Sequence, residues 1–401
     1  MESELKRAYD NLAAWCRKHN YAGYDPFDAL NSRLFQAMPL KHSRAARIIW
    51  TQLFKRSPVN LRKIACVPAA RNAKGMALFA LAALADFRRT RTKEAETEAR
   101  TLLDALLSAR LEGWSGAAWG YNFHWQSRAF FAPQGTPTIV PTAFAARALV
   151  EAAQVFNDEK LVKHARSVCD FILRDLQRSD ETEREVCFSY TPLDDARIFN
   201  ASLLAGETLA SVGALTGEPE LLEWSLKTAR YVIRHQRADG SWAYGPEQRH
   251  AWVDNFHTAF VLLSLTRINA VCPDAIERSS LLAAIQRGYE FWRTQFFVAD
   301  GWPKYYHHKL YPADVHSAAT SIVALLELQN IDSAAPVLAE KIASWAVHHL
   351  YDARGFFYYQ RRRFYTVRTP YIRWAQAWMM YALARLLEES GQWSVVSGQL
   401  E

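Results

Sequence analysis

Cysteine is scarce in this chain of 401 residues and does not form the patterns seen in stapled or metal-binding domains. The five cysteines are odd in number and widely spaced, and no two stand in a C-x-x-C pair. A disulfide framework needs an even number of cysteines, and a structural zinc site needs ligands paired at short spacing. The histidines also lack H-x-x-x-H and H-E-x-x-H spacing. We therefore expect reduced thiols and no metal site.

Long hydrophobic runs are missing as well. No apolar stretch approaches the roughly 18 residues that span a bilayer. The first residues, MESELKRAYDNLAAW, carry acids and have no apolar signal core. We expect no transmembrane segment and a cytoplasmic location.

Several signatures of known chemistry are absent from the sequence. We find no Walker A loop, Rossmann glycine fingerprint, nucleophile elbow or cysteine–histidine signature. This disfavours nucleotide-cofactor and acyl-enzyme chemistry, and no cofactor is predicted. The formal net charge is +7, but the only tight basic run is QRRRFYTVR at 360–368, so nucleic acid is not the expected partner. The positive charge instead favours an acidic ligand.

Aromatic residues, in contrast, are abundant, with 14 Trp, 17 Tyr and 21 Phe. Many lie in loops that contain glycine and recur along the chain, each followed by an alanine-rich helix. The clearest loops are LEGWSGAAWGYNFHW from 111, ADGSWAYGPEQRHAWVDNFH from 238, ADGWPKYYHHKLYPADVH from 299 and ARGFFYYQRRRFYTVRTPYIRW from 353. CFSYTPLDDARIFN from 187 is a more divergent copy. A repeat of this size is the mark of an architecture built from equivalent units.

Two kinds of helix alternate between these loops. Apolar, alanine-rich helices begin near 74, 141, 200, 257, 316 and 374, about 57 to 67 residues apart. More charged helices are predicted at 92–111, 158–177, 218–236, 277–295 and 333–351. A helix that is apolar all round is buried, whereas one with a charged face lies at the surface. The pattern predicts an all-α fold of six inner and six outer helices.

The ends of the chain complete this arrangement. Helices near 4–19 and 43–56 can supply the sixth outer helix, so we expect residues 1–70 to close or cap a ring formed by 71–392, with 393–401 as a tail. We expect four glycines to end outer helices with positive φ: Gly113, Gly240, Gly301 and Gly355. The aromatic loops would then all open at the N-terminal ends of the inner helices.

The pattern resembles the (α/α)6 barrel, or toroid, of the six-hairpin glycosidases. Uronate polysaccharide lyases, glucuronyl C5-epimerases, N-acylglucosamine 2-epimerases and the terpenoid cyclase and prenyltransferase group share this architecture. The resemblance covers roughly residues 70 to 392. One motif, QRADGSW at 236–242, resembles the Q-x-x-x-G-x-W repeat of terpenoid cyclases, but their D-x-D-D motif is absent. YAGYDPFDALNS resembles uncharacterised bacterial proteins found with exopolysaccharide genes, which favours sugar chemistry.

In such toroids the pocket lies at the loop end, where the N-termini of the inner helices point inward. Asp254 and Asp314 occupy nearly the same position in consecutive repeats. They are the candidate acid and base of a glycoside hydrolase, although each also suits a helix N-cap.

Other residues suit proton abstraction from a uronate, which needs a base, an acid and a group that neutralises the carboxylate. His257 and His316 align across repeats, and His124, Tyr371 and Arg373 are further candidates. The remaining residues expected to bind substrate come from the same loops: Trp119, Tyr121, Asn122, Gln126, Trp242, Tyr244, Trp252, Asn255, Trp302, Tyr306 and Trp374.

These observations predict a carbohydrate-active enzyme acting on an anionic, uronate-containing oligo- or polysaccharide, with hydrolysis by the paired aspartates as the first expectation. A uronate lyase or C5-epimerase using His, Tyr and Arg is the alternative within sugar chemistry. Two other classes stay open. One is an isoprenoid-handling toroid whose inner cavity would include Trp374, Trp378, Met379 and Tyr381, and the other is a saccharide-binding protein without catalysis.

Overall fold

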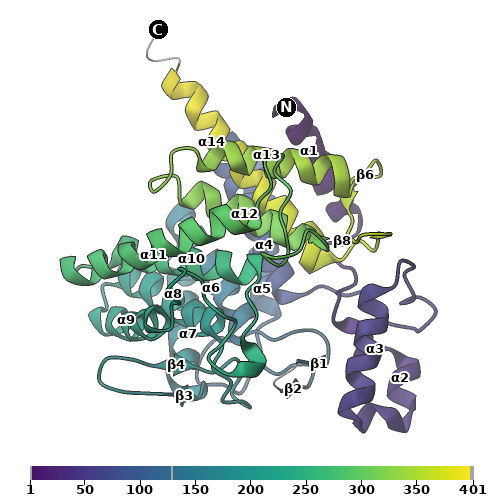
Figure 1. Ribbon diagram of the computed structural model, residues 1–401, viewed down its shortest axis with the longest axis horizontal. Coiled ribbons are helices and arrows are strands. Elements are labelled where there is room, and N and C mark those ends of the chain that lie inside the picture. The colour runs from purple at the N-terminus through teal and green to yellow at the C-terminus, as the bar shows by residue number, and fades with distance from the viewer. Residues whose placement is uncertain (1, 128–129, 398–401) are drawn as a thin grey trace.

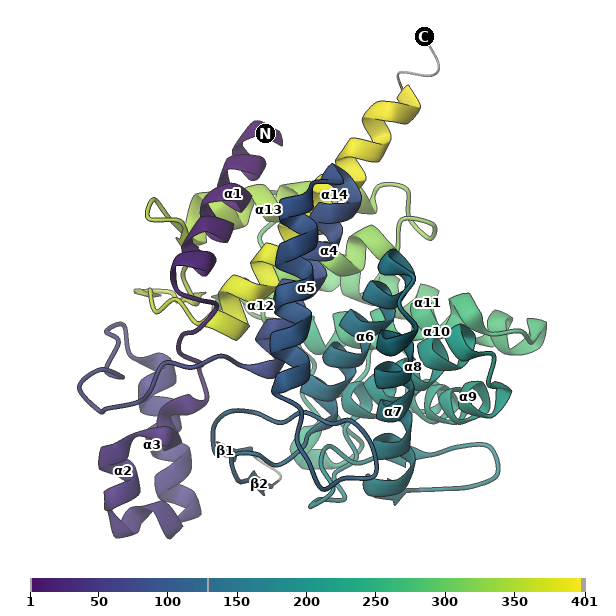
Figure 2. The ribbon, with the colours of Figure 1, turned by 180° about the vertical axis from the view of Figure 1, so that it is seen from behind.

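The computed structural model describes residues 2–127 and 130–397 and is largely helical, with small sheets confined to the loops (Figures 1 and 2). The inner helices are α4 (Ala73–Thr90), α6 (Ile139–Phe156), α8 (Phe199–Thr216), α10 (Asn255–Val271), α12 (Val315–Glu327) and α14 (Trp378–Ser397). Outside them lie α5 (Lys93–Ser108), α7 (Glu159–Asp175), α9 (Pro219–Arg234), α11 (Ala275–Phe296) and α13 (Ala335–Leu350).

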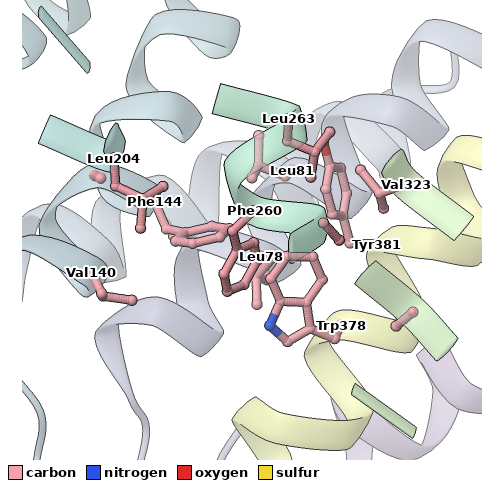
Figure 3. Packing of buried hydrophobic residues seen from close by; sticks show 14 of the residues in the cluster. Leu78, Leu81, Val140, Phe144, Leu204, Phe260, Leu263, Val323, Trp378 and Tyr381 are labelled. Carbon is pink, nitrogen blue, oxygen red and sulfur yellow. The ribbon is translucent and has the colours of Figure 1, made fainter. Parts of the chain in front are cut away.

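The inner helices form a closed ring. Each packs against the next, from α4 to α6 and onward to α12 and α14, and α14 returns to pack against α4. Their apolar side chains meet in the middle, where Phe144, Phe260 and Trp378 come from three different helices (Figure 3). The predicted (α/α)6 toroid is confirmed.

Helix α1 (Glu2–Lys18) packs on α13 and α14. A close contact between a loop glycine and an outer helix occurs more than once in the ring, and α1 takes the place of the outer helix in one of these contacts. In the loop after α9, a Cβ on Gly240 would lie 2.3 Å from the carbonyl oxygen of Arg287 in α11. In the loop after α13, a Cβ on Gly355 would lie 2.8 Å from the carbonyl oxygen of Asn11 in α1. The last loop therefore meets α1 as an earlier loop meets its neighbouring outer helix.

The four predicted glycines do take positive φ, at 83°, 88°, 88° and 93°. They lie several residues beyond the outer helices rather than at their last turns, since α9 ends at Arg234 and Gly240 follows six residues later. Their conformation serves the close approach of each loop to the next outer helix, except at Gly113, where a Cβ would meet open space. In that loop Gly116 makes the close contact, with its Cβ position 1.9 Å from the carbonyl oxygen of Ser167 in α7.

Between α1 and α4 the chain forms a small helical unit, here called the cap segment (residues 25–67). It contains two 3-10 turns, η1 (Asp28–Asn31) and η2 (Pro39–His42), together with α2 (Arg33–Ala37) and α3 (Arg44–Arg56). Its own apolar cluster is built on Ala29, Phe54, Ala65 and Val67. In both ribbon views α2 and α3 stand to one side of the ring, near its loop end (Figures 1 and 2).

The strands are two residues long and tie the loops together. The antiparallel pairs are β1 (Trp125–Gln126) with β2 (Phe131–Ala132), β3 (Arg178–Ser179) with β4 (Cys187–Phe188), and β6 (Tyr351–Asp352) with β7 (Phe356–Phe357). A three-stranded sheet orders β5 (Ala313–Asp314), β8 (Gln360–Arg361) and β9 (Thr366–Val367). It brings the last loop across the start of α12, and the π-helical turn η4 (Ile372–Ala377) then leads into α14.

Within the described residues, one helix is long and apolar enough to cross a membrane by length and composition. It is α6, and 72% of its apolar window is buried inside the protein. Its apolar character is explained by its place in the inner ring, where α4, α7 and α8 pack against it.

Candidate active site

Two aspartates cap neighbouring inner helices at the loop end. Asp254 Oδ1 accepts a hydrogen bond from the backbone N–H of His257 at 3.0 Å, at the start of α10. Asp314 Oδ1 accepts from the backbone N–H of His316 at 2.9 Å, at the start of α12. The capping role that the sequence suggests for both residues is confirmed, and each cap fixes the first turn that carries a histidine.

Asp254 also holds the side chain of His257. Its Oδ2 lies 2.8 Å from His257 Nδ1 and accepts a hydrogen bond from Trp252 Nε1 at 3.1 Å. Asp254 is only 2% exposed, whereas the side chain of His257 is 21% exposed. A carboxylate accepts hydrogen bonds, so this contact selects the neutral tautomer that carries its proton on Nδ1 and has a free electron pair on Nε2. This pairing suits a general base.

Asp314 is fully buried, and both of its oxygens face protein donors. Besides the cap, Oδ1 accepts from Trp374 Nε1 at 3.0 Å, and Oδ2 accepts from Gln360 Nε2 at 2.9 Å. Burial raises the pKa of Asp314 to about 6, although these hydrogen bonds and Lys55 act in the opposite direction. Its carboxyl group is therefore an internal support for Trp374 and η4.

His316 is 1% exposed and lies among aromatic rings. Its ring centroid is 4.2 Å from that of Trp374 and 4.7 Å from that of Phe256. Burial, with Lys74 as the largest charge contribution, holds the pKa of His316 well below its ordinary value, so the imidazole is neutral. Among the residues that the structure describes, none bonds to its Nδ1.

The two histidines flank one aromatic ring. The ring centroid of Phe256 lies 4.0 Å from that of His257 and 4.7 Å from that of His316. Phe260 also contacts both imidazoles, at 6.4 and 5.8 Å between centroids. The repeat thus places two differently supported histidines around one aromatic surface.

Lys74, in the first turn of α4, is a functional candidate that the sequence analysis missed. Its ammonium nitrogen lies 4.3, 5.0 and 5.2 Å from the ring centroids of Phe144, Phe260 and Trp378, the three rings labelled in Figure 3. It is 2% exposed, and within the described part of the chain it forms no ion pair with an acid. Burial lowers the pKa of Lys74 well below its ordinary value. The available signal was a lone charge in the otherwise apolar stretch KGMALFALAALA.

The partly exposed rim beside His257 is aromatic. Tyr244 stacks on Trp252, with ring centroids 4.6 Å apart and planes inclined by 19°, and it contacts His257 at 4.6 Å. These residues line a cavity of about 10 Å³, together with Asn200, whose Oδ1 is buried without a partner among the described residues. That volume holds about one water molecule.

Arg373 was expected to neutralise a substrate carboxylate, but its charge already has a partner. Its Nε and Nη2 donate to the two oxygens of Asp25 at 2.6 and 2.8 Å, and the pair is buried. The guanidinium also lies 5.0 Å from the ring centroid of Tyr121. Arg373 therefore joins the cap segment to η4 and positions Tyr121, whose hydroxyl is 3.4 Å from that of Tyr190.

Two predicted catalytic residues lie apart from the histidine pair. Tyr371 is fully buried, its hydroxyl donates to the carbonyl of Phe54 at 3.4 Å, and Arg62 covers its ring. His124 sits in the loop of β1 and β2, where its Nδ1 accepts from the backbone N–H of Gln134 at 3.1 Å. Both residues contact neighbours that organise the loops and the cap segment.

Three predicted substrate-binding residues are packed inside the fold. Trp119 and Trp242 are buried and donate from Nε1 to the carbonyls of Leu106 and Val232, at 2.7 and 2.9 Å. Asn255 is also buried and donates to the carbonyl of Lys304 at 3.0 Å. These contacts differ from our expectation, because Trp119 and Asn255 are enclosed by protein and Trp242 borders only the small cavity beside His257. The hydrogen bond from Trp242 to Val232, which joins the loop to α9, also explains the cyclase-like QRADGSW stretch.

Other predicted residues contact protein partners at the edges of the loops. The side chain of Gln126 accepts from Arg47, and that of Asn122 accepts from Asn72. Trp302 packs on Trp345 with ring centroids 5.1 Å apart, and the backbone of Tyr306 forms a β-bridge with that of Asp254. In the part of the chain that the structure describes, no group of three or more His, Cys, Asp and Glu is arranged to hold a metal ion.

Comparison with solved structures identifies the architecture. No protein-family model and no curated protein matches the chain. An unsaturated glucuronyl hydrolase from Bacillus sp. GL1 superposes with a TM-score of 0.63 and 14% identity, over 96% of this chain and 97% of that one. A sugar epimerase from a ruminal bacterium gives 0.62 and 12%, over 82% and 90%. A family 76 α-mannanase from Bacteroides thetaiotaomicron gives 0.60 and 10%, over 80% and 87%. The chain has the (α/α)6 toroid fold of these enzymes.

Proposed function

We propose that this protein is a carbohydrate-active enzyme that moves a proton at a sugar carbon, as an epimerase or isomerase, with His257 as the group that takes up and returns the proton and neutral His316 as a hydrogen-bond donor to the substrate. The observation that carries the proposal is their arrangement: two histidines from equivalent turns lie against Phe256, one supported by Asp254 and one neutral and buried. Proton transfer at carbon needs a base that can reach the C–H bond and whose protonated form can give the proton back.

The chemistry follows from the two environments. Nε2 of His257 removes a proton from the carbon next to a carbonyl or carboxyl group, and the electron pair of the C–H bond moves onto the adjoining oxygen. The imidazolium of His257 returns that proton to the same or the neighbouring carbon, and the electron pair moves back. Neutral His316 donates a hydrogen bond from its ring N–H to the substrate and is not itself protonated or deprotonated. Asp254 stabilises the imidazolium that forms on His257, as a buried carboxylate does for a catalytic histidine.

Lys74 supports the anionic intermediate. Its nitrogen is close enough to affect the pKa of His316 and shares Phe260 and Trp378 with that histidine as neighbours. An N–H donor held in an apolar environment stabilises a developing oxyanion more strongly than the same donor in water. We propose that Lys74 donates to the oxygen that gains charge.

Hydrolysis by paired aspartates is the second candidate, and the raised pKa of Asp314, about 6, is the feature in its favour. A glycosidase needs one carboxyl group that reaches the leaving oxygen and one that reaches water or the sugar. Here the oxygens of Asp314 are engaged by Trp374 and Gln360, and those of Asp254 by His257 and Trp252. The geometry therefore favours proton transfer.

The other two classes draw less support. Trp378, Met379 and Tyr381, which an isoprenoid cavity would need at its surface, are fully buried in the ring core. A protein that only binds saccharides does not require an unpaired buried lysine beside a neutral buried histidine, because such groups are costly to bury without a chemical role. We also propose an anionic substrate, since the chain carries a net charge of +7.

The test is a panel of reducing sugars and uronates incubated with the enzyme in D₂O. Proton transfer incorporates deuterium at one carbon, which NMR and mass spectrometry locate. His257→Gln and His316→Gln should each abolish the exchange, while His348→Gln on the exposed face of α13 should leave it unchanged. Cleavage of a glycosidic bond, or consumption of an unsaturated uronyl group without exchange, would establish hydrolysis instead.

A further inference from the structure

A second and much larger cavity lies away from the histidine pair. Its volume is about 1050 Å³, and none of its lining residues lines the small cavity beside His257. Three parts of the chain form it: residues 11–24, which include the C-terminal half of α1 and the turn after it, residues 58–69 after α3, and residues 353–370 of the last aromatic loop. Its volume is at the upper end of the range for small-molecule pockets, which is roughly 300 to 1,000 Å³.

Basic side chains surround this cavity. Lys18, His19, Lys63, Arg354 and Arg368 line it, and no aspartate or glutamate is among the described residues that do. Arg354 is paired with an acid, since Asp352 accepts from its guanidinium at 2.9 Å. Lys18, Lys63 and Arg368 come from separate segments, so they converge by folding and do not form a basic run in the sequence. A concave surface lined by one sign of charge concentrates ligands of the opposite sign.

The wall formed by α1 is aromatic. Trp15 is half-buried and stacks on His19 with ring centroids 3.9 Å apart and planes inclined by 25°. Phe356 lies 5.5 Å from Trp15 and forms the adjoining surface. Flat aromatic faces beside polar groups stack on the apolar faces of sugar rings.

We infer that this cavity binds a stretch of an acidic saccharide chain, with a ring stacked on Trp15 and carboxylates facing Lys18, Lys63 and Arg368. Size, a flat aromatic wall and cations without lining acids are the three features that fit this ligand. A single small anion would leave most of the volume empty. This inference does not depend on the proposed proton transfer, because the cavity shares no lining residue with the rim beside His257.

The experiment is isothermal titration calorimetry of the full chain with a hexamer of 1,4-linked galacturonate at low salt. Lys18→Glu combined with Arg368→Glu should weaken binding by about tenfold or more, as loss of two favourable charges and addition of two repulsive ones require. Trp15→Ala should weaken it by about fivefold, as expected for loss of one stacked ring. The affinity of the parent should fall as salt is added.

The matched control is Lys160→Glu combined with Lys163→Glu on α7, which makes the same change in net charge on exposed residues of another outer helix. It should bind the hexamer within about twofold of the parent. Circular dichroism establishes that each variant is folded. Trp15→Ala keeps the inference testable if the double variant at the cavity does not fold.

Three results would overturn the inference: equal binding by the cavity variants and the parent, equal weakening in the α7 control, or equal affinity for a neutral xylose hexamer. Tighter binding of single-stranded DNA at the same residues would assign the cavity to nucleic acid. His257→Gln should bind the hexamer at this cavity like the parent. Loss of catalysis and loss of cavity binding are therefore separate outcomes.

Discussion

The two ends of the inner ring use buried charge in opposite ways. At the end away from the aromatic loops, every pair of adjacent inner helices is joined by an ion pair. The links are Arg88 to Glu151 at 3.1 Å, Arg147 to Glu207, Glu207 to Arg267 at 2.9 Å, Arg267 to Glu327 at 2.5 Å, Glu327 to Arg385 at 3.7 Å, and Glu388 back to Arg88 at 2.6 Å. This closed circuit joins all six helices.

At the loop end the circuit is absent. Lys74 has aromatic rings instead of an acid around it, and His316 has a buried nitrogen without a partner among the described residues. The same six helices therefore pair their charges at one end, whereas at the other end Lys74 and His316 have no acidic partner among the described residues. We therefore assign the ion pairs to the stability of the ring and the loop end to contact with substrate. Each prediction below tests one of these two assignments.

The largest effect is expected from the histidine pair at the loop end. His257→Gln and His316→Gln should each lower the turnover rate by about 10²- to 10⁴-fold, the usual contribution of a general acid–base group or of a donor that stabilises developing charge. Stability should change little for His257→Gln, because its side chain is partly exposed. Deuterium incorporation by NMR measures the first quantity and chemical denaturation the second. A full rate in either variant would remove that histidine from the mechanism.

The next largest effect is a loss of stability, expected at the end of the ring where ion pairs join the inner helices. Glu207 is buried and accepts from both Arg147 and Arg267, and Ser264 donates to it at 2.7 Å. Glu207→Ala leaves two buried guanidinium groups without this partner, so the free energy of unfolding should fall by about 3–5 kcal/mol. Denaturation by urea measures the change.

The control for Glu207 is Glu96→Ala, which breaks the exposed pair of Glu96 with Arg100 on α5. This loss should stay within about 0.5 kcal/mol. A similar small loss at Glu207 would show that the circuit does not hold the ring together.

The pH response of Asp314 is smaller. Its folded pKa of about 6 lies above the ordinary value of 3.8, so the native carboxyl keeps its proton to higher pH. The contribution of Asp314 to stability is full below pH 3.8 and is lost as the pH rises through 6. Asp314→Asn does not titrate, so its stability relative to the parent should rise between pH 4 and 7, by at most about 2–3 kcal/mol.

Asparagine can fit at position 314 because of a neighbouring amide. Gln360 donates to Asp314 through Nε2, while no described residue is a hydrogen-bond partner of its buried Oε1. A flip of the Gln360 amide would let Oε1 accept from the new Asn amide. Urea denaturation of both proteins at several pH values tests this, and a constant stability difference would contradict the raised pKa.

The alternation of helices could be predicted from the sequence because burial determines it. The apolar helix expected to begin near 141 is α6, which begins at Ile139, and the charged helix expected at 218–236 is α9 at Pro219–Arg234. The caps at Asp254 and Asp314 were also predictable, since capping depends on residues close in sequence.

Contacts between distant parts of the chain could not be predicted in this way. Asp25 pairs with Arg373 across 348 positions, and Arg88 pairs with Glu388 across 300. Such pairs exist only after the ring closes, so no local pattern records them. The same applies to Lys74, because its aromatic neighbours come from α6, α10 and α14.

Lys74→Met gives a smaller expected change in stability than Glu207→Ala or Asp314→Asn, and it is the sharpest test of the comparison. Methionine nearly matches the length and volume of lysine and suits the rings of Phe144, Phe260 and Trp378. Replacing an unpaired buried cation with an apolar side chain should raise the free energy of unfolding by about 1–2 kcal/mol at neutral pH. The lowered pKa of Lys74 means that the parent loses stability as the pH falls, so the advantage of the variant should grow at lower pH.

The same substitution should lower turnover, because the anionic intermediate loses its N–H donor. A variant that is more stable but less active identifies a residue retained for function, since a purely structural lysine would lower stability when it is removed. Lys74→Arg is the companion variant, and it should keep the charge while misplacing the donor. Reduced stability in Lys74→Met, with turnover unchanged, would mean that Lys74 stabilises the fold, as the ion pairs at the other end of the ring do, and has no role in turnover.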